Sequence, residues 1–96
     1  MFEILVIYKI KENVSGADFI NELTQKGVIG SILAEDGCIK YDYYMPFVNG
    51  DTVLLHEIWE SDEHQRIHMT QPHMKLAMEI KQKYVDCVEL KKLTDL

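Results

Sequence analysis

The chain is poor in the residues that build disulfide-linked or membrane-spanning proteins. Its two cysteines, Cys38 and Cys87, are spaced neither as a Cys-x-x-Cys pair nor as a zinc knuckle. We expect both to be buried as small hydrophobic residues in a reducing cytoplasm. No apolar run approaches the roughly 20 residues that cross a membrane, and residues 1–12 lack the basic region and cleavage site of a signal peptide.

Basic residues are also too scarce for a protein that binds polyanions. Ten Lys and Arg against sixteen Asp and Glu give a formal net charge of -6. Nucleic acids and anionic lipids attract basic surfaces, so we expect neither as a partner. The content of 47% hydrophobic and 27% charged residues is typical of a globular protein. A length of 96 residues predicts one domain, 1–96, because two halves would bury too little surface.

The first half of the chain predicts a strand, a helix and a second strand. Residues 2–10 are apolar on both alternating faces, which is typical of a strand covered on both sides. Ser15 is placed to cap the following helix, and Gly27 and Gly30 predict a bend or irregularity in it. Residues 38–44 alternate again and predict the second strand.

The second half predicts a hairpin followed by broken helical structure and a last strand. The Asn49-Gly50 pair favours a tight turn, so residues 52–60 should form a strand antiparallel to the second one. The remaining elements are, in order, a helix capped by Ser61 or Asp62 and broken at Pro72, a helical segment at 73–83, and a strand at about 84–93.

This order, β-α-β-β-α-β, predicts a ferredoxin-like α+β fold with both helical regions on one face of the sheet. The strands carry apolar residues at both parities, so the second face would also be apolar. Soluble monomers avoid large exposed apolar patches. We therefore expect a homodimer in which two sheets pack face to face around a two-fold axis, a dimeric α+β barrel.

Residues 52–74 concentrate the candidate chemistry, because they hold Trp59 and all four histidines: His56, His64, His68 and His73. Imidazole is the side chain whose ordinary pKa lies nearest neutrality. His64 and His68 are four residues apart and therefore share one helix face. This spacing fits a pair lining a pocket and a solvated structural pair equally well, and a metal site less well because no cysteine lies nearby.

Three short motifs resemble those of the antibiotic biosynthesis monooxygenase superfamily, which consists of small dimeric α+β-barrel proteins. They are Glu35-Asp36-Gly37-Cys38 followed by Tyr41, then Glu57-x-Trp59-Glu60-Ser61, then His64-x3-His68-x3-Pro72-His73-Met74. Within the superfamily, the sequence is most similar to bacterial quinol monooxygenases and autoinducer-2-phosphate-processing members. The haem-degrading branch fits less well, because His68 and Met78 stand where that branch has Trp and His.

The resemblance implies a monooxygenase that uses dioxygen without metal or flavin on a quinol or similar aromatic. His68 and His64 would then be the catalytic proton acceptors. The residues expected to bind the substrate are Tyr41, Tyr43, Glu57, Trp59, His73 and Met69. Each has a structural alternative: Glu57 as a buried carboxylate, Trp59 as core or dimer interface, and the tyrosines as sheet packing. His73 would instead anchor the helix break, and Met69 would belong to the core. The lysines, Lys81 among them, are expected on the solvated surface.

Two other functions remain open on the sequence. The first is an isomerase of a small phosphorylated ketone, for which Arg66, the only arginine, is the candidate phosphate ligand. The second is a non-catalytic module that binds a small ligand in a stress response. Neither interpretation needs a metal, a cofactor, nucleic acid or a membrane.

Overall fold

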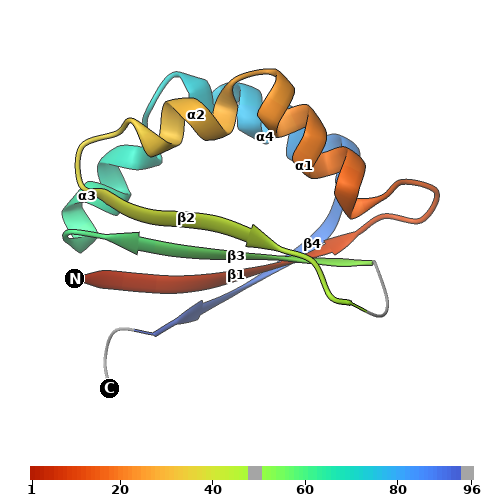
Figure 1. Cartoon of the computed structure of the whole chain (residues 1–96), viewed down its shortest axis with the longest axis horizontal. Coiled ribbons are helices and arrows are strands. Elements are labelled where there is room, and N and C mark those ends of the chain that lie inside the picture. The colour runs from red at the N-terminus through yellow and green to blue at the C-terminus, as the bar shows by residue number, and fades with distance from the viewer. Residues whose placement is uncertain (48–50, 94–96) are drawn as a thin grey trace.

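The computed structural model describes residues 1–47 and 51–93, which form an antiparallel sheet of strand order β2-β3-β1-β4 covered by helices. The elements follow one another as β1 (Phe2–Ile10), α1 (Gly16–Gln25), α2 (Val28–Leu33), β2 (Cys38–Tyr44), β3 (Thr52–Trp59), α3 (Asp62–His68), α4 (His73–Tyr84) and β4 (Val85–Lys92). The helices all lie on one side of the sheet (Figure 1). The predicted ferredoxin-like α+β fold is therefore confirmed. The expected Asn49-Gly50 turn lies outside the described residues.

The central strand β1 shows why one sheet face becomes the core. Its alternate residues Ile4, Val6 and Tyr8 are 1–5% exposed and lie under the helices. Each faces a neighbour on β3, as in the pairing of Val6 with Leu55, which is fully buried. A side-chain period of two places the residues between them on the opposite face. The amphipathic helices thus cover one parity of the strand and leave the other uncovered.

The helical layer is broken in two places, as the sequence predicts. The Ser15 side chain accepts a hydrogen bond from the Asp18 backbone N–H at 3.1 Å and starts α1. Gly27 has a φ of 77°, which favours glycine, and separates α1 from α2. The Ser61 side chain caps α3 in the same way as Ser15 caps α1, and Pro72 precedes α4. Both breaks direct the chain across the sheet.

The sheet face without helices carries an apolar group of partly buried residues: Leu5, Ile7, Leu54 and Ile58. They come from the two central strands β1 and β3, where Leu5 pairs with His56 and Ile7 with Leu54. A hydrogen bond between the His56 and Glu3 side chains lies within the same face. This face is the surface through which the predicted dimer would pack. Among the described helices, none has the length and apolarity needed to cross a membrane.

The two cysteines lie in different environments. Cys38 is half-buried at the start of β2, where burial and the charges of Glu35 and Glu57 raise the pKa of its thiol to about 11. Cys87 is exposed on β4, so the expectation that it is buried is wrong. The reason is that β4 is an edge strand, and its burial pattern is exposed at nearly every position.

A four-residue network on the outer surface ties α1 to the end of α4. Glu22 accepts hydrogen bonds from Lys83 at 2.7 Å, from the Tyr84 hydroxyl at 2.8 Å and from Lys26 at 3.0 Å. Hydrogen bonds from Lys83, Tyr84 and Lys26, in that order, lower the pKa of Glu22 from 4.5 to about 2. The ionised carboxylate is therefore bound more tightly in the folded chain than in the unfolded one.

We expect Glu22→Gln to lower the melting temperature at neutral pH and to have no effect near pH 2. The stabilisation from a carboxylate with a lowered pKa is present above its usual 4.5 and is lost as the pH falls toward about 2. Thermal unfolding followed by circular dichroism from pH 2 to 7 measures this, with Glu12→Gln as an exposed control. A difference from wild type that stays constant over this range would contradict the assignment.

Candidate functional site

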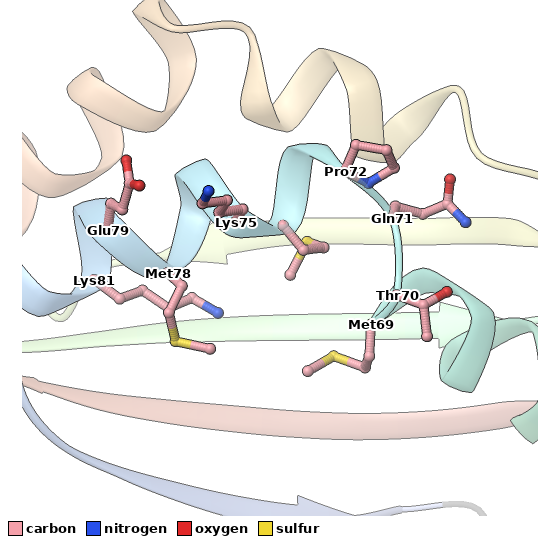
Figure 2. Close-up of a pocket in the computed structure, with 9 residues that line it drawn as sticks. Met69, Thr70, Gln71, Pro72, Lys75, Met78, Glu79 and Lys81 are labelled. Atoms are coloured by element: carbon pink, nitrogen blue, oxygen red, sulfur yellow. The ribbon is translucent and has the colours of Figure 1, made fainter.

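A cavity of about 610 Å³ opens beneath α4 and the connection from α3 to α4 (Figure 2). Its apolar wall comes from Met69, Met74, Met78 and Pro72. Met69 and Met78 lie at the two ends of this wall (Figure 2) and are 52% and 53% exposed. The volume is within the range of sites that bind small organic molecules. Methionine side chains are flexible and polarisable, so they adapt well to a flat aromatic ligand.

The break at Pro72 creates the cavity wall. A turn follows α3, in which the Thr70 N–H bonds to the Ile67 carbonyl at 3.0 Å, and it carries the chain toward the start of α4. Within α4, Met74, Met78 and Lys81 are spaced by four and three residues and therefore share one stripe of the helix. This stripe runs beside the one that packs on the sheet, so its side chains border the cavity.

Lys81 is the polar residue that extends deepest along this wall. It is half-buried and reaches beneath α4 (Figure 2), with its Nζ 5.5 Å from the centre of the Tyr8 ring. Burial lowers the pKa of the Lys81 ammonium, and the nearby Glu57 carboxylate partly opposes this. The expectation that Lys81 belongs to the solvated surface is therefore wrong. Packing of the whole helix against the sheet places it inward, which its polar neighbours in sequence do not indicate.

Glu57 lies on β3 under the helices and is 5% exposed. Its carboxylate accepts a hydrogen bond from the Trp59 indole N–H at 2.9 Å. Burial raises the pKa of Glu57, and the indole bond and the charges of His68 and Lys81 act against this rise. Burial thus shifts Glu57 and Lys81 in opposite directions, each toward its neutral form. Groups perturbed in this way beside a cavity are typical of functional sites.

Aromatic rings fill the interior between β2, β3 and α3. The Trp59 and His68 rings lie 4.6 Å apart at a tilt of 32°, and Tyr41 meets them edge-on at 6.4 Å and 5.7 Å. Tyr43 contacts Tyr41 with 5.8 Å between ring centres. Burial raises the pKa of Tyr41 and of Tyr43, so both hydroxyls stay protonated at neutral pH. These stacked rings pack between the sheet and the helices.

Two histidines converge on Glu35, which follows α2. His68 Nδ1 lies 2.9 Å from Glu35 Oε2 and 3.1 Å from Oε1, and His73 Nε2 lies 2.7 Å from the same Oε2. The His68 side chain is 1% exposed, that of Glu35 9% and that of His73 22%. Each imidazole can donate an N–H to the carboxylate, so this cluster joins the ends of three helical segments.

His64 belongs to a different surface. Its Nδ1 lies 2.7 Å from the Ser61 hydroxyl oxygen, and its Nε2 faces Asp36 at 3.4 Å. It borders a smaller cavity of about 160 Å³, which Glu35 and Gln71 also line. His64 and His68 therefore have different bonding partners, although they share a helix.

The sequence matches the family model described as antibiotic biosynthesis monooxygenase over residues 1–80. The chain belongs to the antibiotic biosynthesis monooxygenase family. No curated protein matches it in sequence.

Solved structures support the fold of this antibiotic biosynthesis monooxygenase family member. One described as an antibiotic biosynthesis monooxygenase is 18% identical, with a TM-score of 0.79 and coverage of 100% of this chain and 99% of that one. A Nitrosomonas europaea protein is 13% identical, with a TM-score of 0.83 and coverage of 100% and 99%. Protein PA3566 from Pseudomonas aeruginosa is 17% identical, with a TM-score of 0.79 and coverage of 99% and 93%. At these identities the likeness shows the fold alone.

The predicted site residues of this family member fall into three groups, all within the described part of the chain. Met69 lines the larger cavity. The interior holds Tyr41, Glu57, Trp59 and His68, and Tyr43 packs partly buried against it, while His73 and His64 lie at the outer end of the helices. Sequence reasoning missed Lys81 and the role of Glu35. The spacing of Lys81 from Met74 and Met78 was the available signal for the first; nothing local indicated the second.

Proposed function

We propose that this family member is a cofactor-independent monooxygenase acting on a quinol or a similar electron-rich aromatic, as in the quinol monooxygenase branch. One observation carries the proposal: a methionine-lined cavity whose inner wall holds a half-buried lysine with a lowered pKa. An apolar wall fits an aromatic ring, and a lysine in such a place can accept a proton or hold a phenolate. Membership of the monooxygenase family supports the same reaction class.

The proposed chemistry follows from the electronic state of dioxygen. Triplet dioxygen reacts slowly with closed-shell molecules, but an aromatic anion can transfer one electron to it and so avoid the spin barrier. The resulting radicals combine into a peroxide, which takes up a proton and loses water. A quinol and one dioxygen then give a hydroxyquinone and one water, so atoms and electrons balance. The protein must supply an apolar space and a residue that removes the first proton.

Lys81 is the residue we propose for that proton transfer. Its lowered pKa increases the share of the neutral amine, which is the form that accepts a proton. After the transfer, the ammonium would face the substrate anion, while Glu57 stabilises the positive charge. The sequence-based assignment of the same role to His68 or His64 stays a prediction. The same holds for the expected substrate contacts, which are those of Tyr41, Tyr43, Glu57, Trp59, His73 and Met69.

We also propose that the protein acts as a homodimer that packs through the helix-free sheet face. The apolar residues of β1 and β3 on that face support this, because a second copy would bury them. We expect Leu54→Glu to give a monomer, since two carboxylates would meet an apolar partner surface near the two-fold axis. Sedimentation equilibrium measures the mass. A Leu54→Glu protein that sediments as wild type, or a monomeric wild type, would rule out this interface.

The test of function is oxygen uptake with a reduced naphthoquinol and chelator-treated protein, beside the substrate's own autoxidation. We expect uptake well above autoxidation and its loss in Lys81→Met. If His68→Ala abolishes uptake in a folded protein while Lys81→Met retains it, the proton acceptor is His68. Uptake equal to autoxidation would exclude quinol oxygenation. A bound naphthoquinone analogue without turnover would then favour the non-catalytic binding module.

A second candidate, isomerisation of a small phosphorylated ketone, is favoured by two cations on the cavity wall, Lys75 and Lys81. Here Lys81 would act in its protonated form, so that both ammonium groups bind the phosphate, whereas oxygenation uses its neutral form. Arg66, the residue expected for that role, instead pairs with Asp62 at 3.0 Å on the exposed surface of α3. Binding of a phosphorylated ketone that is lost in Lys75→Met but kept in Arg66→Ala would support this function over oxygenation.

A further inference from the structure

We propose that Glu35, His68 and His73 form a binding site for zinc or a similar divalent transition metal ion. One carboxylate oxygen and two imidazole nitrogens, His68 Nδ1 and His73 Nε2, lie within 4.8 Å of one another. Two histidines and one carboxylate are a donor set that proteins use for zinc and for divalent iron. The site lies apart from the methionine-lined cavity, which none of the three residues lines.

The geometry needs only a small adjustment to hold an ion. Both nitrogens already face the same oxygen, Glu35 Oε2, at 2.9 Å and 2.7 Å. Bonds of about 2.0–2.1 Å around a tetrahedral ion place neighbouring ligand atoms about 3.4 Å apart. Each of these two contacts therefore has to lengthen by roughly half an ångström, and the two nitrogens, which lie within 4.8 Å of each other, have to reach the same separation. The ion would take the place of the protons that the two imidazoles otherwise donate to the carboxylate.

The surroundings of the cluster suit a metal site better than those of an ordinary surface ion pair. The side chains of His68 and Glu35 are 1% and 9% exposed, so water competes little for them. Packing of the His68 ring on Trp59 fixes its orientation, as outer contacts do at metal sites. Glu35 also borders the cavity of about 160 Å³, so water has access to the carboxylate from that side.

The three ligands also come from the ends of three different helical segments, which a bound ion would crosslink. Glu35 follows α2, His68 ends α3 and His73 begins α4. An ion would therefore link the end of α3 to the start of α4 across the break at Pro72. It would also link both to the segment that follows α2. Because binding to the folded chain alone stabilises it, zinc should raise the melting temperature.

A neighbouring group of Asp36, Glu60 and His64 is the internal comparison. Its ligand atoms also lie within 4.8 Å of one another. The Asp36 and Glu60 side chains, however, are 95% and 60% exposed, and they lie 3.4 Å and 3.7 Å from His64 Nε2. Exposed carboxylates stay hydrated and bind ions weakly. We therefore place the tight site at Glu35 and use His64 as the matched control.

Isothermal titration calorimetry of chelator-treated protein with zinc chloride tests the proposal. We expect one zinc ion per chain, a higher melting temperature with zinc, and a cobalt complex with the visible bands of a four-coordinate ion. His73→Gln should weaken zinc binding by about 100-fold or more and remove the thermal shift. His64→Gln should change neither. Circular dichroism establishes that each variant is folded.

Three results would overturn the proposal. They are the absence of zinc binding at micromolar concentrations, binding that His73→Gln does not weaken, and binding that is lost in His64→Gln instead. Glu35→Gln is the second variant, because it keeps the size of the side chain and removes its charge. If it binds zinc as the wild type does, the carboxylate is not a ligand. These readouts do not depend on oxygenation, so the proposed function can fail while the metal site stands.

Discussion

Lys81→Met is expected to lower oxygen uptake with a naphthoquinol by about 100-fold or more while raising the melting temperature. The rate falls because loss of a positioned proton acceptor typically costs 10²–10⁴-fold, by order of magnitude. Stability rises because methionine fills a similar volume in the apolar wall without the penalty of burying an ammonium. A gain in stability together with a loss of rate is typical of residues kept for function.

The gain in stability expected for Lys81→Met should also depend on pH. Burial lowers the pKa of Lys81 below its usual 10.5 in the folded chain. Between the two values the unfolded chain binds more protons, so the stability contributed at this position rises with pH. The advantage of Lys81→Met over wild type should therefore be largest near neutrality and shrink toward pH 10.5. Thermal unfolding at a series of pH values measures it.

The matched control is Lys83→Met, on the same helix two residues away. Lys83 is more than half exposed and bonds to Glu22, far from the cavity wall. We expect wild-type oxygen uptake and a slightly lower melting temperature. If both variants lose uptake equally, the effect is one of helix charge and not of the cavity. If Lys81→Met keeps full uptake, Lys81 is not the proton acceptor.

Gly37→Ala is expected to destabilise the protein by about 2–4 kcal/mol. Gly37 has a φ of 81°, a conformation that residues with a Cβ rarely adopt. A Cβ there would lie 2.2 Å from His64 Cδ2 and 2.4 Å from His64 Cγ. The backbone cannot withdraw easily, because the Gly37 carbonyl accepts the Glu60 N–H at 2.8 Å. Urea unfolding at neutral pH gives the free energy of unfolding.

A double-mutant cycle separates the two sources of this loss. His64→Ala removes the ring that an alanine at position 37 would meet, but it leaves the backbone strain in place. We expect Gly37→Ala to be less damaging in the His64→Ala background, with a coupling of about 1 kcal/mol or more. Strictly additive losses would mean that the strained φ alone accounts for the effect. A Gly37→Ala protein as stable as wild type would contradict both sources.

The sequence predicts the fold well because the fold depends on local signals that repeat along the chain. Alternation of apolar residues defines residues 2–10 as the central strand, and the structure gives the same bounds. The side chains of Ser15 and Ser61 start helices by accepting hydrogen bonds from the backbone N–H groups three residues on. Gly27 and Pro72 end helical segments for steric reasons that depend on no distant contact.

The candidate site is less predictable because it depends on contacts between distant residues. Glu35 contacts His68 and His73, which lie 33 and 38 positions away in sequence. No local sequence pattern predicts such contacts. Lys81 lies in a polar stretch at the end of α4, so its burial follows only from how the helix rests on the sheet. Histidine spacing likewise left open whether His64 and His68 line one pocket, and the structure places their side chains against different neighbours.

The larger cavity has a wall drawn from one continuous stretch of chain, residues 69–81. Most of the buried core lies outside that stretch, but Met74, Ala77 and Ile80 lie inside it and belong to the same core. Residues 69–81 therefore carry two kinds of position, one that packs the helix on the sheet and one that borders the cavity. We expect substrate preference to be changed by exchanging Met69, Met78 and Lys81 while the three core positions are kept.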